Sequence, residues 1–158
     1  INGKVNIGFI CPEHVAVGVQ YMTRGNMKRE NIIGCKYCLD KKKYKFSKGE
    51  KKIKEYLDDK NYLHIEQYIF NDCKDKTYLP FDFYLPEKNV IIEYDGQHHF
   101  SPVTFNGITQ EEARNNHEKT KYHDKIKDKY CADNGIQIIR IPYWDYKNIN
   151  TILDQKIA

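Results

Sequence analysis

The sequence feature that most constrains the fold is a pair of short apolar segments that carry acidic residues. Residues 81–85 and 90–95 are rich in Phe, Tyr, Ile and Val, and the turn-forming stretch Pro-Glu-Lys-Asn separates them. Such a pattern is typical of a β-hairpin. Asp82, Glu93 and Asp95 lie within its strands. Three carboxylates in so apolar a hairpin repel one another and lose hydration, and a hard cation such as Mg²⁺ would relieve this repulsion.

Two capping boxes indicate where helices should begin. Ser47 and Glu50 stand three residues apart, as do Thr109 and Glu112, and apolar residues recur at helical spacing after the first pair. In a capping box each of the two side chains bonds the backbone N–H of the other residue. We therefore expect helices over residues 47–61 and 109–133, the second closed by Asn-Gly at 134–135.

Further patterns complete the predicted order of elements. Stretches rich in β-branched and aromatic residues predict strands at 62–70 and 136–141, whereas the polar stretches 71–77 and 97–107 predict loops. Ile149, Ile152 and Leu153 suggest a last short helix. The order helix, three strands, helix, strand, helix predicts an α/β (α+β) fold with a mixed sheet flanked by helices.

Length, composition and charge set the class of protein. The chain has 158 residues, of which 40% are hydrophobic, and this is enough to build the core of one ordinary domain. It contains no apolar run long enough for a membrane span and no secretion signal, so we expect a cytoplasmic protein of a bacterial or virus-infected cell with no membrane partner. A net charge of +4 is compatible with a nucleic-acid partner.

The N-terminal part differs from the rest in its pattern. Residues 1–45 show little hydrophobic periodicity and end in a lysine run, whereas regular periodicity begins near residue 47. Zinc binding would explain how so polar a segment folds. We therefore expect two domains, a zinc-binding module with a basic linker at 1–45 and a second domain at 46–158.

The predicted zinc ligands form a CxxH pair, Cys11 and His14, and a CxxC pair, Cys35 and Cys38. Each short spacing lets both side chains reach one ion, and four such ligands satisfy tetrahedral zinc in a closed structural site. The alternative is that two unrelated local patterns coincide. Cys73 and Cys131 have no partner at ligand spacing, and we interpret the remaining pair as ordinary buried thiols.

The acidic hairpin is a candidate site for a divalent ion. Residues two apart in a strand share a face, so Glu93 and Asp95 project the same way, and Asp82 on the partner strand can lie across from them. Mg²⁺ or Mn²⁺ takes such oxygen ligands and could activate water beside a phosphate. His98 and His99 follow the strand and could act as general base or acid. The alternative is a solvated strand edge with acidic residues for solubility.

Two predicted helices carry further candidates. Glu50 belongs to the capping box, which needs no other function, but it also shares the inward face of its helix and could reach the acidic cluster. Asp124 and Lys127 share a face with Cys131 on the long helix. This lysine could approach a phosphate and Asp124 could hold the lysine or a histidine, or both could belong to a solvated face of paired charges.

Four segments together resemble the PD-(D/E)XK nuclease superfamily. They are DFYLP at 82–86, IIEYDGQH at 91–98, HDKIK at 123–127 and GIQIIRIP at 135–142. The likeness covers roughly residues 47–150, and the nearest branch is that of the very-short-patch repair endonuclease and the EDxHD homing endonucleases. The Cys/His segment is similar to zinc modules that precede such domains in phage and giant-virus proteins.

This resemblance implies a restriction-endonuclease-like αβββαβ core preceded by a small zinc-ribbon-like module. The implied activity is that of a metal-dependent DNA endonuclease of the homing, repair or phage type, with double-stranded DNA as partner. One domain has one site, so cutting both strands would need a homodimer or a second event. The alternatives are a non-catalytic zinc-containing DNA-binding module with a degenerate nuclease fold, and a nuclease that acts on RNA.

The resemblance also implies roles for individual residues. Asp82 would be the metal-binding aspartate, Glu50 the first-helix glutamate and Asp124 the second-helix aspartate, with His98 or His99 as the loop histidine. Glu93 and Asp95 would lie on the strand that carries the (D/E)XK signature. Because Asp95 stands where the signature has lysine, the general base stays open between a histidine and Lys127.

The zinc prediction can be checked on the purified chain. Metal analysis should find about one zinc per chain, as a closed site of four ligands requires, and a Cys35→Ser variant should lose it. Protein that folds and contains no zinc would contradict the zinc module without affecting the nuclease prediction.

Overall fold

The computed structural model describes residues 6–10, 19–23, 45–104 and 107–157, and the chain divides into two compact units at residues 1–45 and 46–158. In the first unit β1 (Asn6–Ile10) pairs antiparallel with β2 (Val19–Thr23). The proposed zinc ligands lie outside the described residues: Cys11, His14, Cys35 and Cys38.

The second unit contains the predicted elements in the predicted order. In chain order these are α3 (Lys48–Asp59), β3 (Ile65–Tyr68), β4 (Phe81–Leu85), β5 (Val90–Asp95), α4 (Gln97–Phe100), α5 (Gln110–Asp133), β6 (Gln137–Pro142), the 3₁₀ helix η2 (Tyr143–Asn148) and α6 (Ile149–Lys156). The strands form one sheet of order β3-β4-β5-β6, antiparallel except for the parallel pair β5 and β6.

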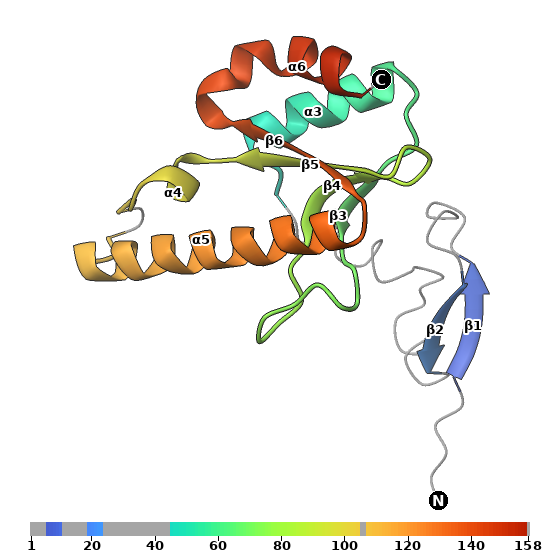
Figure 1. Cartoon of the computed structure of the whole chain (residues 1–158), viewed down its shortest axis with the longest axis horizontal. Helices are drawn as coiled ribbons and strands as arrows, with labels where there is room; N and C mark the ends of the chain where they lie inside the picture. Colours follow the sequence, from blue (N-terminus) through green and yellow to red (C-terminus); the bar gives the residue numbers. More distant parts are fainter. Residues whose placement is uncertain (1–5, 11–18, 24–44, 105–106, 158) are drawn as a thin grey trace, which may run out of the picture. The chain divides into compact units, whose positions relative to one another are not determined.

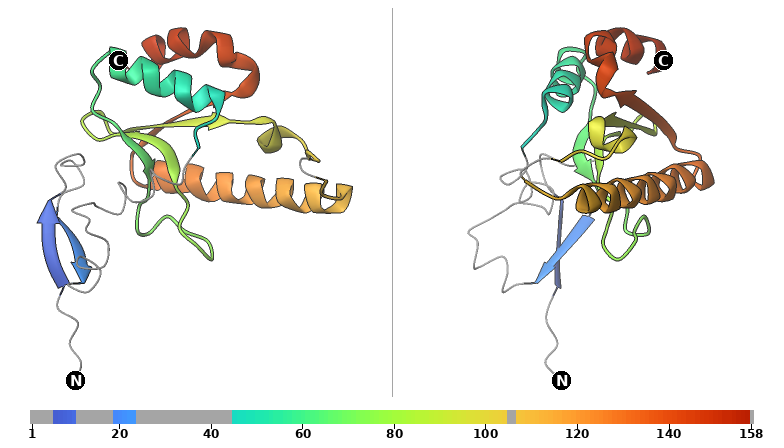
Figure 2. Two further views of the ribbon diagram at one scale, coloured as in Figure 1. Left: turned by 180° about the vertical axis from the view of Figure 1, so that it is seen from behind. Right: turned by 90° about the vertical axis from the view of Figure 1, so that its left-hand side faces the viewer.

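Helices cover both faces of this mixed sheet. Helices α3 and α6 lie together on one face and the long helix α5 crosses the other, as two views of the unit show (Figures 1 and 2). The predicted α+β arrangement with a mixed sheet between helices is confirmed. A right-handed crossover through α5 is the usual way to connect parallel neighbours such as β5 and β6.

Both predicted capping boxes are present. Ser47 Oγ accepts from the Glu50 N–H at 3.2 Å while the Glu50 carboxylate accepts from the Ser47 N–H, and Thr109 and Glu112 repeat the arrangement. The first helix ends where Asn61 adopts a φ of 56°, a left-handed conformation that asparagine tolerates well. The local signals in the sequence therefore set these helix boundaries.

Two local predictions differ from the structure. The strand expected at 62–70 forms only at Ile65–Tyr68, because the Tyr62 N–H still donates to the Leu57 carbonyl at the end of α3. The loop expected at 97–107 begins with the single helical turn α4, whose bond from the His99 N–H to the Gly96 carbonyl sequence periodicity cannot reveal in so short a segment.

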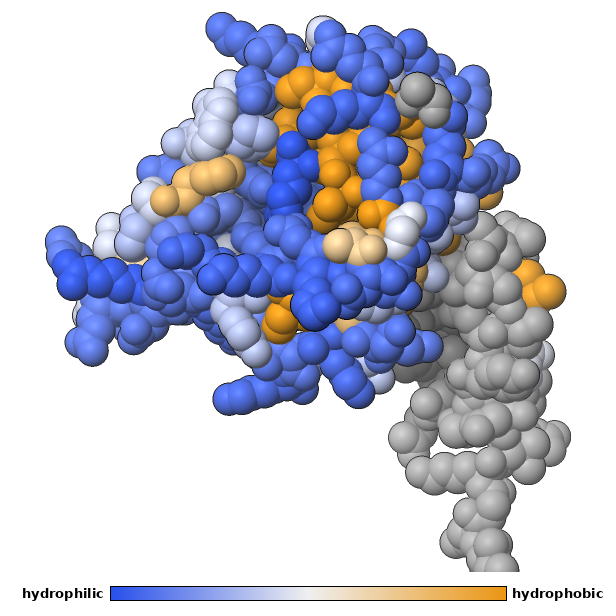
Figure 3. Space-filling model, in the orientation of Figure 1, coloured by the Kyte–Doolittle hydropathy of each residue, from blue (hydrophilic) through white to orange (hydrophobic). Residues whose placement is uncertain are grey.

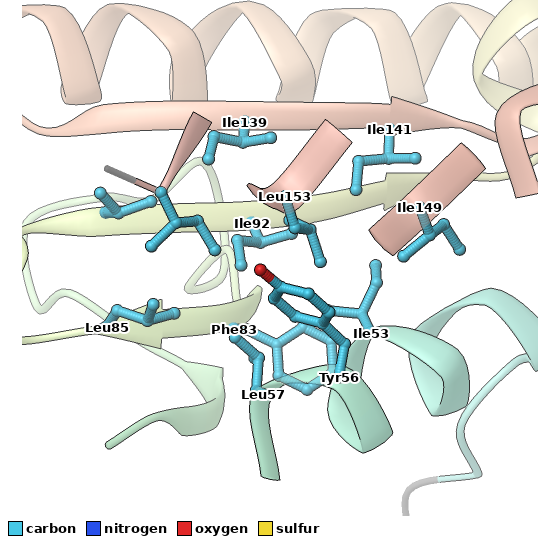
Figure 4. Packing of buried hydrophobic residues seen from close by; sticks show 12 residues of the cluster. Ile53, Tyr56, Leu57, Phe83, Leu85, Ile92, Ile139, Ile141, Ile149 and Leu153 are labelled. Atoms are coloured by element: carbon cyan, nitrogen blue, oxygen red, sulfur yellow. The ribbon is translucent and has the colours of Figure 1, made fainter. Parts of the chain in front are cut away.

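The apolar core lies on both sides of the sheet. Between the sheet and the α3–α6 pair, alternate residues of β4, β5 and β6 meet the inward faces of the two helices (Figure 4). A second cluster lies against α5 and includes Cys73 and Cys131, so the prediction of buried thiols is confirmed. The principal members of the first cluster are Ile53, Leu57, Phe83, Ile92, Ile139, Ile141, Ile149 and Leu153.

The surface is mainly hydrophilic along α5, and apolar side chains show chiefly between α3 and α6 (Figure 3). Four lysines of α5 are exposed, Lys119, Lys121, Lys125 and Lys129, and two of them pair with carboxylates of the same helix. No helix in the described part of the chain is long and apolar enough to cross a membrane.

Two leucines provide a matched test of this core. Leu57 is fully buried and Leu63 is 46% exposed. We expect Leu57→Ala to lower the free energy of unfolding by about 2–5 kcal/mol because it leaves a cavity, and Leu63→Ala to change it by about 0.5 kcal/mol or less. Urea unfolding followed by circular dichroism measures both. Equal losses would contradict the assignment of Leu57 to the core.

Candidate functional site

The candidate site forms where the β4–β5 hairpin stops pairing. The ladder runs from Leu85–Val90 to Phe83–Ile92, one residue short of Asp82 and Glu93. There the side chains replace the ladder: the Asp82 N–H donates to Glu93 Oε1 at 3.3 Å, and the Tyr94 N–H donates to Asp82 Oδ2 at 2.8 Å. The two carboxylates are thus brought together at the point where the strands separate.

These carboxylates belong to a polar row that crosses the whole sheet. Glu93 pairs with Arg140 of β6 in the register of the parallel strands. Asp82 lies one step beyond the Phe83–Ile92 pair, opposite Glu93. Gln67 of β3 lies between two paired positions, opposite Asp82, and its Nε2 donates to Asp82 Oδ1 at 3.1 Å. Each of the four strands therefore contributes one polar residue to the same level of the sheet.

Lys127 of α5 contacts this row from the helical layer. Its Nζ donates to both oxygens of Glu93, at 3.0 and 2.9 Å, and both side chains are almost fully buried. The ammonium also lies 4.9 Å from the centre of the Phe81 ring. A cation is therefore held directly at the carboxylate pair, as the apolar surroundings require.

Burial and mutual repulsion make the carboxyl groups of Asp82 and Glu93 difficult to ionise. Burial, and then the charges of Glu93 and Glu50, raise the pKa of Asp82 well above its ordinary value. Burial also raises the pKa of Glu93, although Lys127 acts in the opposite direction. A second positive charge at this point would relieve the repulsion and keep both groups ionised.

Glu50 approaches the same cluster while it also caps α3. It is 6% exposed, and its charge is among those that raise the pKa of Asp82. The close approach depends on Gly49, because a Cβ there would overlap the ring of Tyr94 on β5. The first turn of α3 can therefore rest directly on the sheet, so the capping role and a position beside Asp82 are compatible.

Asp95, Asp124 and His99 form a second group at the same end of β5. His99 Nδ1 lies 2.8 Å from Asp124 Oδ2 and 3.6 Å from Asp95 Oδ1. Arg140 Nη1 donates to Asp95 Oδ1 at 2.8 Å, and its Nη2 lies 3.3 Å from Asp124 Oδ1. The two aspartates therefore hold the imidazole and the guanidinium beside each other.

The charges in this group stabilise one another. Burial alone raises the pKa of the Asp124 carboxyl, but the bond from His99 and the charge of Arg140 bring that pKa below its ordinary value. Burial acts to lower the pKa of the Arg140 guanidinium, whereas Asp95 and Asp124 raise it above its ordinary value. Asp124 is accordingly ionised near neutral pH and can orient His99.

The two candidate histidines differ in their surroundings. His99 is half-buried against Asp124, whereas the His98 side chain is exposed and its backbone carbonyl accepts from His117 Nδ1 at 2.9 Å. Asp124 and Lys127 contact the site rather than a solvated surface, so the alternative of a solvated helix face for these two residues is wrong.

Sequence reasoning assigned no role to Gln67 or Arg140. A signal existed for Arg140, because a lone basic residue in the apolar run at 136–141 must project from a strand between buried neighbours. No local pattern indicates Gln67, whose position depends on the register of β3 against β4.

The acidic side chains of the site are candidate ligands for a metal ion. No group of three or more His, Cys, Asp or Glu side chains is arranged to hold a metal ion within the parts of the chain that the structure describes. Mg²⁺, however, keeps several waters and is often bound through one or two carboxylates plus substrate phosphate. Asp82 and Glu93 meet that need, and Glu93 already holds a cationic ammonium, whereas Asp95 is engaged by Arg140.

Comparisons with known proteins give one viral relative. Uncharacterized protein 307L of Invertebrate iridescent virus 6 is 32% identical over 79 residues, which are 50% of this chain and 38% of that protein. The chain therefore spans little more than a third of that relative's length. No model of a known protein family matches the chain, and no solved structure matches it.

The raised pKa of Asp82 predicts a pH-dependent stability. The folded protein keeps this proton to a higher pH than the unfolded chain does, so the associated stability is present below about pH 4 and is lost as pH rises through the folded-state pKa. Asp82→Asn removes this titration, so in the metal-free protein the stability of the variant relative to the wild type should be more favourable at pH 7.5 than at pH 4.5, although its amide nitrogen must face one of the two donors of Asp82.

Urea unfolding in EDTA at the two pH values measures this difference. Asp59→Asn, at an exposed position on α3, is the control and should change stability little at either pH. A loss of stability in Asp82→Asn that is equal at both pH values would contradict the assignment.

Proposed function

We propose that this chain is a metal-dependent DNA endonuclease with a restriction-endonuclease-like αβββαβ core and a zinc-ribbon-like module before it. The observation that carries the proposal is that the carboxylates of Asp82 and Glu93 lie together where the strands of the hairpin stop pairing. The element order and the sheet order β3-β4-β5-β6 agree with the fold that the sequence resemblance implies. A soluble cytoplasmic location is part of the same proposal.

In this proposal Asp82 and Glu93 would hold Mg²⁺ or Mn²⁺, with Glu50 next to them. The ion supplies Lewis-acid polarisation of a phosphodiester and a water of lowered pKa. Asp95 has a different part, since its carboxylate pairs with Arg140 and steadies His99. The donor chemistry suits a hard divalent cation, because both ligands are carboxylates.

The residues of the chain provide the proton transfer and the remaining charge. When His99 Nδ1–H donates to Asp124, Nε2 is left as the acceptor that can take a proton from water or approach a phosphate oxygen. Lys127, at the carboxylate pair, adds a positive charge that can neutralise a phosphate when substrate draws it from Glu93. We therefore favour His99 over His98 and Lys127 as the general base.

We favour double-stranded DNA as the substrate because the chain carries a net charge of +4. The exposed lysines of α5 lie on the same helix as Asp124 and Lys127. Lysines that neutralise phosphates provide attraction without sequence preference. A homodimer, or two successive nicks, would be needed to cut both strands.

A second candidate function is a DNA-binding module without catalysis. It is favoured by the ion pairs themselves, because Lys127 already satisfies both oxygens of Glu93 and Arg140 satisfies Asp95. A network of this kind could be purely structural. The two candidates differ in whether a divalent ion can displace the ammonium from Glu93.

Cleavage of supercoiled plasmid with Mg²⁺ tests the proposal. The wild-type chain should nick the plasmid, and Asp82→Ala and Glu93→Gln should each lose about 100-fold or more of that rate, as expected when a metal ion that contributes several kcal/mol is lost. Glu87→Gln, an exposed substitution in the turn of the same hairpin, is the matched control and should keep the wild-type rate.

Three other results would redirect the interpretation. DNA binding without Mg²⁺-dependent nicking would favour the non-catalytic module. Nicking that survives in both site variants would point to a contaminant or to a different site. Faster cleavage of labelled RNA than of duplex DNA under the same conditions would assign the activity to RNA.

A further inference from the structure

Gln67 adopts a backbone conformation that its residue type disfavours. Its φ is 50°, in the left-handed region, although it lies within strand β3. Glutamine is rare there because its Cβ and long side chain crowd the backbone. Gln67 is also missing from the ladder, which pairs Glu66 with Phe83 and Tyr68 with Phe81. The strand is therefore interrupted at one residue, opposite Asp82.

The positive φ of Gln67 is unusual for its residue type when compared with the rest of the described chain. Apart from glycine, the only other residues with positive φ in the ranges that the structure describes are Asn61 and Asn89. Asn61 closes a helix and Asn89 lies in the β4–β5 turn, and asparagine is the usual choice for such places. At Gln67 the chain carries a longer amide, so local backbone preference does not explain the residue.

The hydrogen bond from the Gln67 side chain to Asp82 explains why a glutamine occupies this position. Gln67 Nε2 donates to Asp82 Oδ1 at 3.1 Å, while the Tyr94 N–H donates to Asp82 Oδ2. Each carboxylate oxygen thus has one fixed donor, from a strand on either side. An asparagine at position 67 would be one methylene shorter and would fall short of Asp82. Backbone strain that persists beside a polar cluster is typical of functional sites.

We propose that Gln67 is a positioning residue that fixes the Asp82 carboxylate for divalent-ion binding. The amide holds one oxygen in place, so that the remaining lone pairs of the carboxylate keep a constant direction toward the ion. Hydrogen-bond partners of metal ligands commonly control ligand orientation in this way. This inference rests on the metal site of the proposed function and names a residue outside the predicted set.

Two substitutions separate positioning from simple stability. Gln67→Asn and Gln67→Gly both suit a φ of 50° and both remove the bond to Asp82. Asn61→Gly, a left-handed position outside the site, is the control for the backbone change. Calorimetric titration of each purified protein with Mn²⁺ gives the ion affinity, and thermal unfolding in EDTA gives the stability.

Both Gln67 variants should bind Mn²⁺ about 10- to 100-fold more weakly than the wild type. Their unfolding midpoints should stay within about 4 °C of the wild-type value, and Asn61→Gly should bind Mn²⁺ normally. In plasmid cleavage, the Mg²⁺ concentration for half-maximal rate should rise by a similar factor, with a smaller change in the rate at saturating Mg²⁺.

Three results would overturn the positioning role. They are unchanged Mn²⁺ affinity in both variants, weaker binding that accompanies a large fall of the unfolding midpoint in both, and a wild-type chain that binds no Mn²⁺. A wild-type chain that binds Mn²⁺ with an affinity that depends on Gln67 and Asp82 but does not nick DNA would support this inference and contradict the nuclease function, so the two failures are distinguishable.

Discussion

The central constraint on this fold is that two carboxylates, the buried Glu93 and the half-buried Asp82, lie together at one level of a four-stranded sheet. Asp82 and Glu93 would separate if charge repulsion alone acted on them, because burial removes the water that would screen them. Lys127 and Arg140, from the helix and the strand that follow the hairpin, supply the opposing charge. The crossover from β5 through α5 to β6 thus both completes the sheet and neutralises the site.

One face of the sheet carries the larger apolar core, and the other face carries the polar residues of the candidate site. The face toward α3 and α6 is apolar, and its buried residues form the larger core. The face toward α5 combines a smaller apolar cluster with the polar row. Because strand residues alternate between faces, Ile92 can anchor the core while Glu93 beside it serves the site. A rigid core next to the site keeps its carboxylates in place.

Much of the site could be predicted because its residues break local patterns. Acidic residues inside apolar strands pointed to Asp82, Glu93 and Asp95, whereas spacing on the long helix left Asp124 and Lys127 open between a site and a solvated face. The sequence could not predict which basic side chain forms an ion pair with which carboxylate. Arg140 pairs with Asp95 and Lys127 with Glu93, a choice that depends on strand register and on the position of α5 across the sheet.

The sequence by itself determined the element order, the two capped helices and the acidic hairpin, because these depend on residues close together in the chain. Only the tertiary structure decided that the hairpin separates at Asp82 and that His99 rather than His98 meets Asp124. It also decided that Gln67 lies opposite Asp82 in a left-handed conformation. These features arise from contacts between distant segments, and a local pattern carries no record of them.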